Sequence, residues 1–362
     1  TPPGHFTNFP EDQRNPVGCY RREFTLPPQW NGRRTFIVFN GVDSAFYLWI
    51  NGHMIGYSQD SRTPAEFDLT KHLREGANVI AAEVYQHCDG SYLEDQDMWR
   101  MSGIFRDVYL WSAGTLDVRD QDILATLDDS FSKGRLGYRI DVRNNTGADT
   151  TGSLTAELLD PGGKAMFTRK HPLTIKAGAG TTAESPLEDI AGARFWSAEE
   201  PTLYQFVTTL HDQAGKEISS QSTRIGFRRN EVKDGQFLHN GKPVLFKGVN
   251  RHDHDPATGH YVPEKTMRAD LVRMKQAAIN AIRSSHYPND PLFLDLCDEF
   301  GFYLIDEANI EAHGMGWGAD NNPLAKDPAW GPAHLDRMKN LVERDKNHPC
   351  VVMWSMGNES GD

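Results

Sequence analysis

The chain has 362 residues, of which 38% are hydrophobic, and its formal net charge is −12 at pH 7. A hydrophobic fraction of this size supports packed cores, which excludes a disordered protein, and the length predicts two or three domains. The negative charge argues against a nucleic-acid partner, because a protein that binds polyanions normally carries a basic face. We therefore expect a neutral substrate.

No apolar run approaches the roughly 20 residues of a membrane-spanning helix. The first residues, TPPGHFTNFPEDQ, do not have the charged and apolar regions of an export signal. The four cysteines, at positions 19, 88, 297 and 350, lie far apart without the spacing of a metal site. We expect buried free thiols, which suit a reducing compartment, and hence a cytoplasmic protein with no membrane partner.

The first two thirds of the sequence consist of short β-rich runs between turn residues. In AFYLWI and VIAAEVYQ, apolar and polar residues alternate, and NG, DG and EG pairs bound the runs, as is typical of half-buried antiparallel strands. We predict a β-sandwich over residues 1–115. Similar runs of lower hydrophobicity follow over residues 116–228, and their spacing predicts an immunoglobulin-like sandwich.

After residue 229 the pattern changes to alternating strands and helices. VLFKGVNRH is predicted to be a buried strand, and PEKTMRADLVRMKQAA to be a helix whose residues Met267, Leu271, Met274 and Ala278 share one apolar face. Three further strands, NAIRSSH, FYLIDEANI and CVVMWSMGNES, alternate with two more helices. This β-α-β-α-β-α-β order is typical of a barrel or of a doubly wound sheet.

Each of these four strands ends in polar residues, found at 250–252, 283–286, 306–313 and 358–359. In a (β/α)₈ barrel the C-terminal ends of the strands build the active site, and four strands make half of such a barrel. Glu359 follows Gly357 and Asn358 at one of these ends. A single Glu in a loop is usually only solvated, but the neighbouring polar strand ends favour a catalytic acid that protonates a leaving-group oxygen.

Glu311 and His313 are separated by one residue, so in an extended segment their side chains share a face. Two carboxylates and one imidazole suit a divalent cation, and oxygen-rich ligands favour magnesium or manganese over zinc. An arginine partner for Glu311 and a turn-capping role for His313 are the alternative. RHDHD at 251–255 also offers metal-ligand residue types, but its side chains alternate in direction, so we expect one inward histidine and a solvated remainder.

Five stretches resemble the large bacterial β-galactosidases of glycoside hydrolase family 2, and the resemblance extends over essentially the whole chain. They are GSYLEDQDMWRMSGIFRDV, FKGVNRHDHDP, IRSSHYPNDP, LIDEANIEAHGM and WSMGNESG. The resemblance implies a jelly-roll sugar-binding domain at 1–115, an immunoglobulin-like domain at 116–228 and the first half of a catalytic TIM barrel, strands one to four, at 229–362. It also implies retaining hydrolysis of terminal β-D-galactosides such as lactose, by a complete enzyme that is a homo-oligomer.

By the same resemblance Glu359 is the general acid/base, and Glu311, His313 and Glu359 hold Mg²⁺ or Mn²⁺. Asp97 matches a Na⁺ ligand. Alanine stands at position 312 where threonine is more usual, but this side chain is expected to point away from the ion. The resemblance further implies a set of substrate-binding residues: Asn15, Asp97, His252, Arg283, His286 and Asn358. Within this set, it implies that Arg283 supports the nucleophile and that Asn358 binds the sugar 2-hydroxyl.

Two alternatives remain open. A β-glucuronidase or other β-glycosidase of this family would share the SHYP and GNE stretches, but a glucuronidase is not expected to have the E-x-H pair after DEANI. The family places its nucleophile after the seventh barrel strand, so we expect this chain to carry the acid/base without the nucleophile. The chain by itself would then be an inactive excerpt, or a non-catalytic galactoside-binding or complementation fragment.

Overall fold

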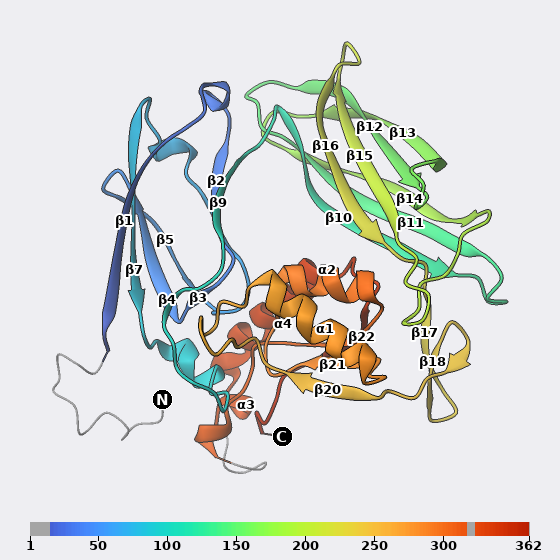
Figure 1. Ribbon diagram of the computed structural model, residues 1–362. Coiled ribbons are helices and arrows are strands. Elements are labelled where there is room, and N and C mark those ends of the chain that lie inside the picture. The colour runs from blue at the N-terminus through green and yellow to red at the C-terminus, as the bar shows by residue number, and fades with distance from the viewer. Residues whose placement is uncertain (1–14, 317–322, 362) are drawn as a thin grey trace.

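The computed structural model describes residues 15–316 and 323–361. Two β-sandwiches and a parallel sheet covered by helices follow one another along the chain (Figure 1). The first sandwich and the helices of the parallel sheet are joined by direct hydrogen bonds, such as the one from Arg337 to Glu94. This arrangement is the one expected from the sequence patterns.

The first sandwich consists of two main antiparallel sheets and a short pair of strands. In β4 (Ala45–Ile50) the alternation expected from AFYLWI is present, because Phe46, Leu48 and Ile50 are buried in the core. The four-stranded sheet has the order β1 (Val17–Thr25), β7 (Ala77–Tyr85), β4 and β5 (His53–Gln59). The other elements are the sheet β6 (Ala65–Asp68), β2 (Thr35–Phe39) and β9 (Val108–Ser112), and the pair β3 (Val42–Asp43) and β8 (Gly103–Ile104).

The edge strand β1 shows that one expectation about the cysteines is wrong. Cys19 lies on β1, where eight of the nine residues are exposed, so its thiol is exposed rather than buried. Cys88 is half-buried, and only Cys297 and Cys350 are fully buried. All four are free thiols, as expected. The exposed position of Cys19 follows from the edge position of its strand, which within residues 15–316 and 323–361 pairs with β7 alone.

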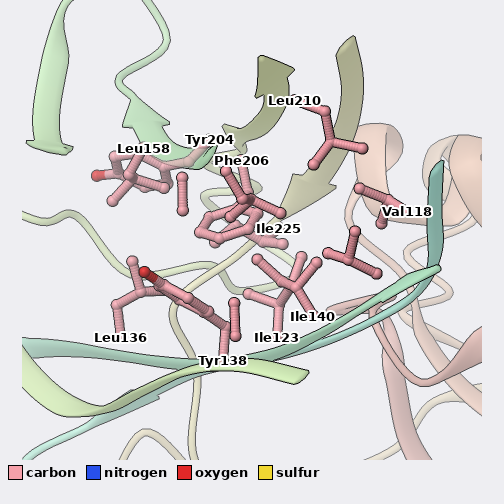
Figure 2. Close-up of a cluster of buried hydrophobic side chains, with 14 of the residues drawn as sticks. Val118, Ile123, Leu136, Tyr138, Ile140, Leu158, Tyr204, Phe206, Leu210 and Ile225 are labelled. Atoms are coloured by element: carbon pink, nitrogen blue, oxygen red, sulfur yellow. The ribbon is translucent and has the colours of Figure 1, made fainter. Parts of the chain in front are cut away.

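The second sandwich encloses the largest apolar core among the described residues (Figure 2). Leu136, Tyr138 and Ile140 from β11 face Phe206 and Leu210 from β15, and all are buried. One sheet has the order β10 (Leu116–Leu127), β11 (Gly134–Asn144) and β14 (Gly180–Ile190). The other has the order β13 (Ala165–Ile175), β12 (Thr150–Leu159), β15 (Tyr204–Asp212) and β16 (Glu217–Ile225).

A three-stranded antiparallel sheet links this sandwich to the parallel sheet: β17 (Asn230–Lys233), β18 (Gln236–His239) and β19 (Lys242–Pro243). This sheet was not predicted from the sequence. The parallel sheet follows in the order β20 (Gly248–Arg251), β21 (Ala281–Ser284), β22 (Tyr303–Glu307) and β23 (Val351–Ser355). Its helices are α1 (Glu264–Gln276), α2 (Pro291–Phe300), α3 (Pro323–Lys326) and α4 (Gly331–Asp345).

Helices α1, α2 and α4 lie where the sequence predicts them, although α1 ends at Gln276, two residues before its predicted end. In α1, Met267 and Leu271 are buried as expected, whereas Ala278 lies two residues beyond the helix in a left-handed conformation. The Asp290 side chain accepts a hydrogen bond from the Leu292 backbone and so caps α2, whose first residue is a proline. Gly301 ends α2 with a φ of 75°, which glycine adopts without steric cost. None of the described helices is long and apolar enough to cross a membrane.

The first parallel strand is less buried than its apolar sequence predicts. Gly248 and Asn250 are exposed and Val249 is only half-buried, so of the four residues of β20 only Arg251 is buried. The reason is the position of β20 at the edge of the sheet, where β21 is its only neighbour among the described strands. The inner strand β22 shows the expected pattern, because four of its five residues are buried.

A buried ion pair lies at the N-terminal end of β23, away from the polar strand ends. The His348 imidazole and the Asp298 carboxylate are 2.6 Å apart, and the Asp298 side chain is fully buried. Burial by itself would lower the pKa of His348, but the charge and hydrogen bond of Asp298 raise it to about 9. His348 is therefore protonated in the folded protein at neutral pH.

We expect this pair to make stability depend on pH. Because the pKa of His348 is higher in the folded state than its ordinary value of 6.5, its contribution is complete below about pH 6.5 and is lost as pH rises through 9. The full shift corresponds to roughly 3 kcal/mol. Thermal melts of the full-length protein between pH 6 and 9.5 should show a declining Tm that is flatter in His348→Gln. Parallel slopes in both proteins would contradict this assignment.

Candidate active site

The polar side chains at the C-terminal ends of the parallel strands converge around Glu307, the last residue of β22. Its carboxylate accepts hydrogen bonds from Arg283 at 2.7 and 2.9 Å and from His286 at 2.7 Å. The same Arg283 guanidinium donates to the Asn358 side-chain oxygen at 3.0 Å. Three of the residues predicted to contact substrate are thus brought together, and they come from the ends of β21 and β23.

Glu359 is held against residues 310–313 by the turn that precedes it. The Asn358 backbone N–H donates to the Ile310 carbonyl at 2.9 Å. A Cβ at Gly357, which has a φ of 134°, would come within 2.5 Å of that same oxygen, so this close approach requires glycine. Glu359 itself adopts a φ of 38°, a left-handed conformation that is uncommon for residues other than glycine and is often found at functional sites.

Glu311, His313 and Glu359 form a compact cluster in which the ligand atoms all lie within 4.8 Å of one another. His313 Nδ1 is 2.7 Å from Glu359 Oε2. Glu311 Oε2 is buried and has no hydrogen-bond partner, which is unusual for a carboxylate oxygen. A cation bonded to these oxygens would supply the missing partner, so the three residues fit a divalent metal. The arginine partner considered for Glu311 is not found among its described contacts.

The electrostatics of Glu311 favour the same conclusion. The pKa of Glu311 is raised to about 7, chiefly by burial. The Asn358 side chain and His286 act to lower it, and the charges of Glu359 and Asp97 act to raise it. An ionised carboxylate in this position is costly unless positive charge lies beside it. Asp97 is exposed on a loop of the first sandwich, and its effect on Glu311 places it near the cluster.

His252 contacts the group of side chains around Glu307, whereas Asn15 bonds elsewhere. The His252 ring makes an edge-to-face contact with His286, at a centroid distance of 5.5 Å. Burial lowers the pKa of His252, and the nearby His286 adds to the effect, so His252 is neutral at pH 7. The Asn15 side chain instead bonds the backbone N–H and carbonyl of His87, both at 3.0 Å. None of its hydrogen bonds reaches another predicted site residue in the described chain.

The expectation for the RHDHD segment is wrong. Asp253 is buried rather than solvated, because it forms ion pairs with Arg251 and with Arg106 of the first sandwich. Asp255 is also buried, and its carboxylate accepts hydrogen bonds from the turn that follows it. His252, by contrast, is the exposed residue facing the site. Asp253 therefore joins the first sandwich to the parallel-sheet domain, whereas Asp255 stabilises the turn that follows it.

Sequence reasoning missed the part played by one loop of the first sandwich. The Asp95 backbone N–H donates to the Glu311 carbonyl at 3.0 Å, and the Asp95 carboxylate accepts from the Gly314 N–H at 2.7 Å. The Gln96 side chain donates to the His286 carbonyl at 3.2 Å. The first sandwich thus supports the segment that carries Glu311 and His313. The only signal in the sequence is the polar stretch EDQD.

A buried ion pair anchors this loop. The Glu94 carboxylate accepts hydrogen bonds from Arg337 of α4 at 2.7 Å and from the Ser61 N–H at 3.1 Å, and both charged side chains are nearly inaccessible to solvent. Losing either partner would leave an uncompensated buried charge. The loop and the helix beside the site are therefore held in a fixed relation.

The chain belongs to glycoside hydrolase family 2. Three family models match in order: the sugar binding domain of glycosyl hydrolases family 2 at residues 4–114, the central glycosyl hydrolases family 2 domain at 116–228, and the family 2 TIM barrel domain at 230–362. Together with the observed sheets, they confirm the predicted fold class of jelly-roll sandwich, immunoglobulin-like sandwich and four strands of a TIM barrel.

Curated relatives are β-galactosidases. Those of Vibrio cholerae and Yersinia enterocolitica are 46% and 45% identical over 96% of this chain, which spans about a third, 34%, of the length of each. Solved structures with the same fold include a β-glucuronidase of Bacteroides uniformis, with a TM-score of 0.82, 24% identity and coverage of 93% of this chain and 40% of that one. A β-galacturonidase of Eisenbergiella tayi bound to galacturonate has a TM-score of 0.80, 26% identity and coverage of 93% and 57%.

Proposed function

We propose that the full-length protein is a β-galactosidase that hydrolyses terminal β-D-galactosides with retention of configuration. The observation that carries the proposal is the cluster of Glu359 with Glu311 and His313 at the polar end of the parallel sheet. Sequence identity near 45% to β-galactosidases over nearly the whole chain supports the galactoside substrate. This chain contributes the acid/base, and the nucleophile is expected from a later barrel strand.

Glu359 performs two proton transfers in this proposal. It first protonates the leaving-group oxygen while a second carboxylate attacks the anomeric carbon, and it then removes a proton from the water that hydrolyses the glycosyl-enzyme. Its side chain is 37% exposed and next to His313, so it can reach both a substrate and water. Mg²⁺ or Mn²⁺ held by Glu311, His313 and Glu359 would supply positive charge beside the acid/base. Asp97 would contribute one ligand to Na⁺.

The remaining residues of the site bind and orient the sugar. His286 and Arg283 are fixed by Glu307, and His252 lies beside His286, so these side chains can offer hydrogen bonds to hydroxyl groups. Asn358 is proposed to bond the 2-hydroxyl, an interaction that strengthens in the transition state.

A uronide substrate is the second candidate, because glucuronidases and a galacturonidase share the fold. Such a substrate needs a basic side chain for its carboxylate. Two arginines lie among the polar strand ends. Arg251 is buried in ion pairs with Asp253 and Asp270. Arg283 is already paired in a bidentate manner with Glu307. These pairings favour a neutral galactoside.

The proposal is tested by comparing nitrophenyl β-D-galactoside with nitrophenyl β-D-glucuronide as substrates of the full-length protein. We expect kcat/KM to favour the galactoside by on the order of 100-fold or more, because polar groups arranged for one sugar discriminate strongly against another. Equal or greater activity on the glucuronide would overturn the assignment of the substrate.

The 362-residue chain expressed by itself is expected to show no turnover of nitrophenyl β-galactoside. It carries the proposed acid/base but not the group that forms the glycosyl-enzyme. A polypeptide containing barrel strands five to eight would then be added, and recovery of nitrophenyl β-galactoside hydrolysis would be measured. Multiple turnovers by the chain alone, with its mass verified, would show that the nucleophile lies within these residues.

A further inference from the structure

Glu307 is a carboxylate at the centre of the site that the proposed mechanism does not use. It ends strand β22, and its side chain has no solvent exposure. Each of its oxygens is engaged: Oε1 accepts from Arg283 Nη2 at 2.9 Å and from His286 Nδ1 at 2.7 Å, and Oε2 accepts from Arg283 Nε at 2.7 Å and from Ser355 at 2.6 Å. Four donors from two neighbouring strand ends therefore converge on one carboxylate.

These contacts keep Glu307 ionised and exclude it from proton transfer. Burial by itself would raise its pKa, but the hydrogen bonds from His286, Ser355 and Arg283 outweigh burial and lower it. A carboxylate with both oxygens bonded to protein donors has no free oxygen for a leaving group or an anomeric carbon. Its role is therefore to orient the side chains that it bonds.

The consequence for His286 is a defined tautomer. Because Nδ1 is the atom that faces the Glu307 carboxylate, it carries the proton and donates, and Nε2 at the opposite side of the ring is left to accept. The His286 side chain is 18% exposed, so part of the ring is accessible from the site. A neutral carboxamide at position 307 would bond either tautomer and would no longer fix this choice.

Glu307 also fixes the plane of the Arg283 guanidinium, which in turn bonds the residue that precedes the acid/base. Glu307 binds Nε and Nη2 of the guanidinium, and Nη2 is shared with the Asn358 side-chain oxygen at 3.0 Å. Asn358 directly precedes Glu359 in the chain. A bidentate pair of this kind sets the orientation of both partners, which a single hydrogen bond does not.

We propose that Glu307 is a positioning residue that holds His286 and Arg283, and through Arg283 the Asn358 side chain, in the orientation that binds the sugar. This inference rests on the proposed function, because His286, Arg283 and Asn358 are substrate contacts only in that function. Nothing in the chemistry requires Glu307 to touch the substrate. Its effect on activity must therefore pass through these neighbours.

The test uses Glu307→Gln in the full-length protein. Loss of a carboxylate that orients a metal-ligating histidine typically costs 10- to 100-fold, and Glu307 orients His286 in the same manner, so we expect kcat/KM for nitrophenyl β-galactoside to fall by about 50-fold. In a His286→Ala background the same substitution should cost much less, because one of the two groups that Glu307 positions is already absent. Equal fold losses in both backgrounds would show that Glu307 acts independently of His286 and would overturn the proposal.

Asp298→Asn is the matched control. Asp298 is also a fully buried carboxylate bonded to a histidine Nδ1, but it lies at the opposite end of β23. We expect this variant to lower the Tm and to leave kcat/KM of the folded enzyme within about threefold of wild type. A loss of activity in Asp298→Asn as large as in Glu307→Gln would assign both effects to general destabilisation and would contradict a positioning role.

Two different results would separate the role of Glu307 from the proposed function of the protein. A wild-type enzyme that hydrolyses β-galactosides and a Glu307→Gln variant of unchanged kcat/KM would overturn the role of Glu307 alone. A wild-type protein without activity on β-galactosides would overturn the proposed function and this role with it.

Discussion

Replacing Glu359 by glutamine in the full-length protein is expected to lower kcat/KM for lactose by about 100- to 10,000-fold, the range of a lost general acid. For dinitrophenyl β-galactoside the glycosylation step should change little, because that leaving group departs without a proton. Glutamine has the size of glutamate but cannot transfer a proton. The measurement is kcat/KM across a series of aryl galactosides whose leaving groups differ in pKa.

A surface glutamate provides the control for this series. Glu343 on α4 has a side chain that is 61% exposed, and among the described residues its ion pair is with Lys346, so Glu343→Gln should leave kcat/KM for every substrate unchanged. Equal losses in Glu359→Gln for good and poor leaving groups would contradict the assignment of Glu359 as the acid.

Removal of divalent metal is the second change with a large expected effect. Dialysis of the full-length protein against EDTA should depress galactoside hydrolysis, and added Mg²⁺ or Mn²⁺ should restore it. The physical reason is the buried Glu311 carboxylate, which lacks a partner for one oxygen and gains one when a cation binds. Glu311→Gln should raise the Mg²⁺ concentration needed for half-maximal activity by about tenfold or more, because it removes a charged ligand.

Unchanged activity of the wild-type protein after complete chelation would contradict the metal assignment. A full restoration by Mg²⁺ in Glu311→Gln at the wild-type concentration would exclude Glu311 as a ligand. The first result would show that activity needs no divalent metal. The second would show that residues other than Glu311 hold the metal.

Local sequence pattern was sufficient for the elements with strong periodicity. The helices α1, α2 and α4 and the four parallel strands follow from apolar spacing and from capping residues such as Asp290 and Gly301. Strands β13 and β14 were not predicted. Both contain a proline, at positions 172 and 186, and both lie at sheet edges, where strands need neither high hydrophobicity nor a complete set of backbone donors.

The candidate site was predictable only where its residues are neighbours in sequence or carry a recognised motif. Glu311 and His313 share a short motif, and the stretch SMGNESGD indicated Glu359. The contacts of Glu307 and Asp95 depend on the tertiary fold, since Asp95 and its partner Gly314 are 219 positions apart. The charges around Asp253 were misjudged for the same reason, because Arg106 belongs to a different domain.

Rescue by azide distinguishes a general acid/base at Glu359 from a nucleophile. The full-length Glu359→Ala variant would be incubated with dinitrophenyl β-galactoside and sodium azide, and the product analysed by NMR. Azide needs no general base, so it should attack the galactosyl-enzyme from the face that Glu359 vacates. We therefore expect β-galactosyl azide as the product, formed at an accelerated rate. Formation of α-galactosyl azide would identify Glu359 as the nucleophile, and the absence of any azide product would likewise exclude Glu359 as the acid/base.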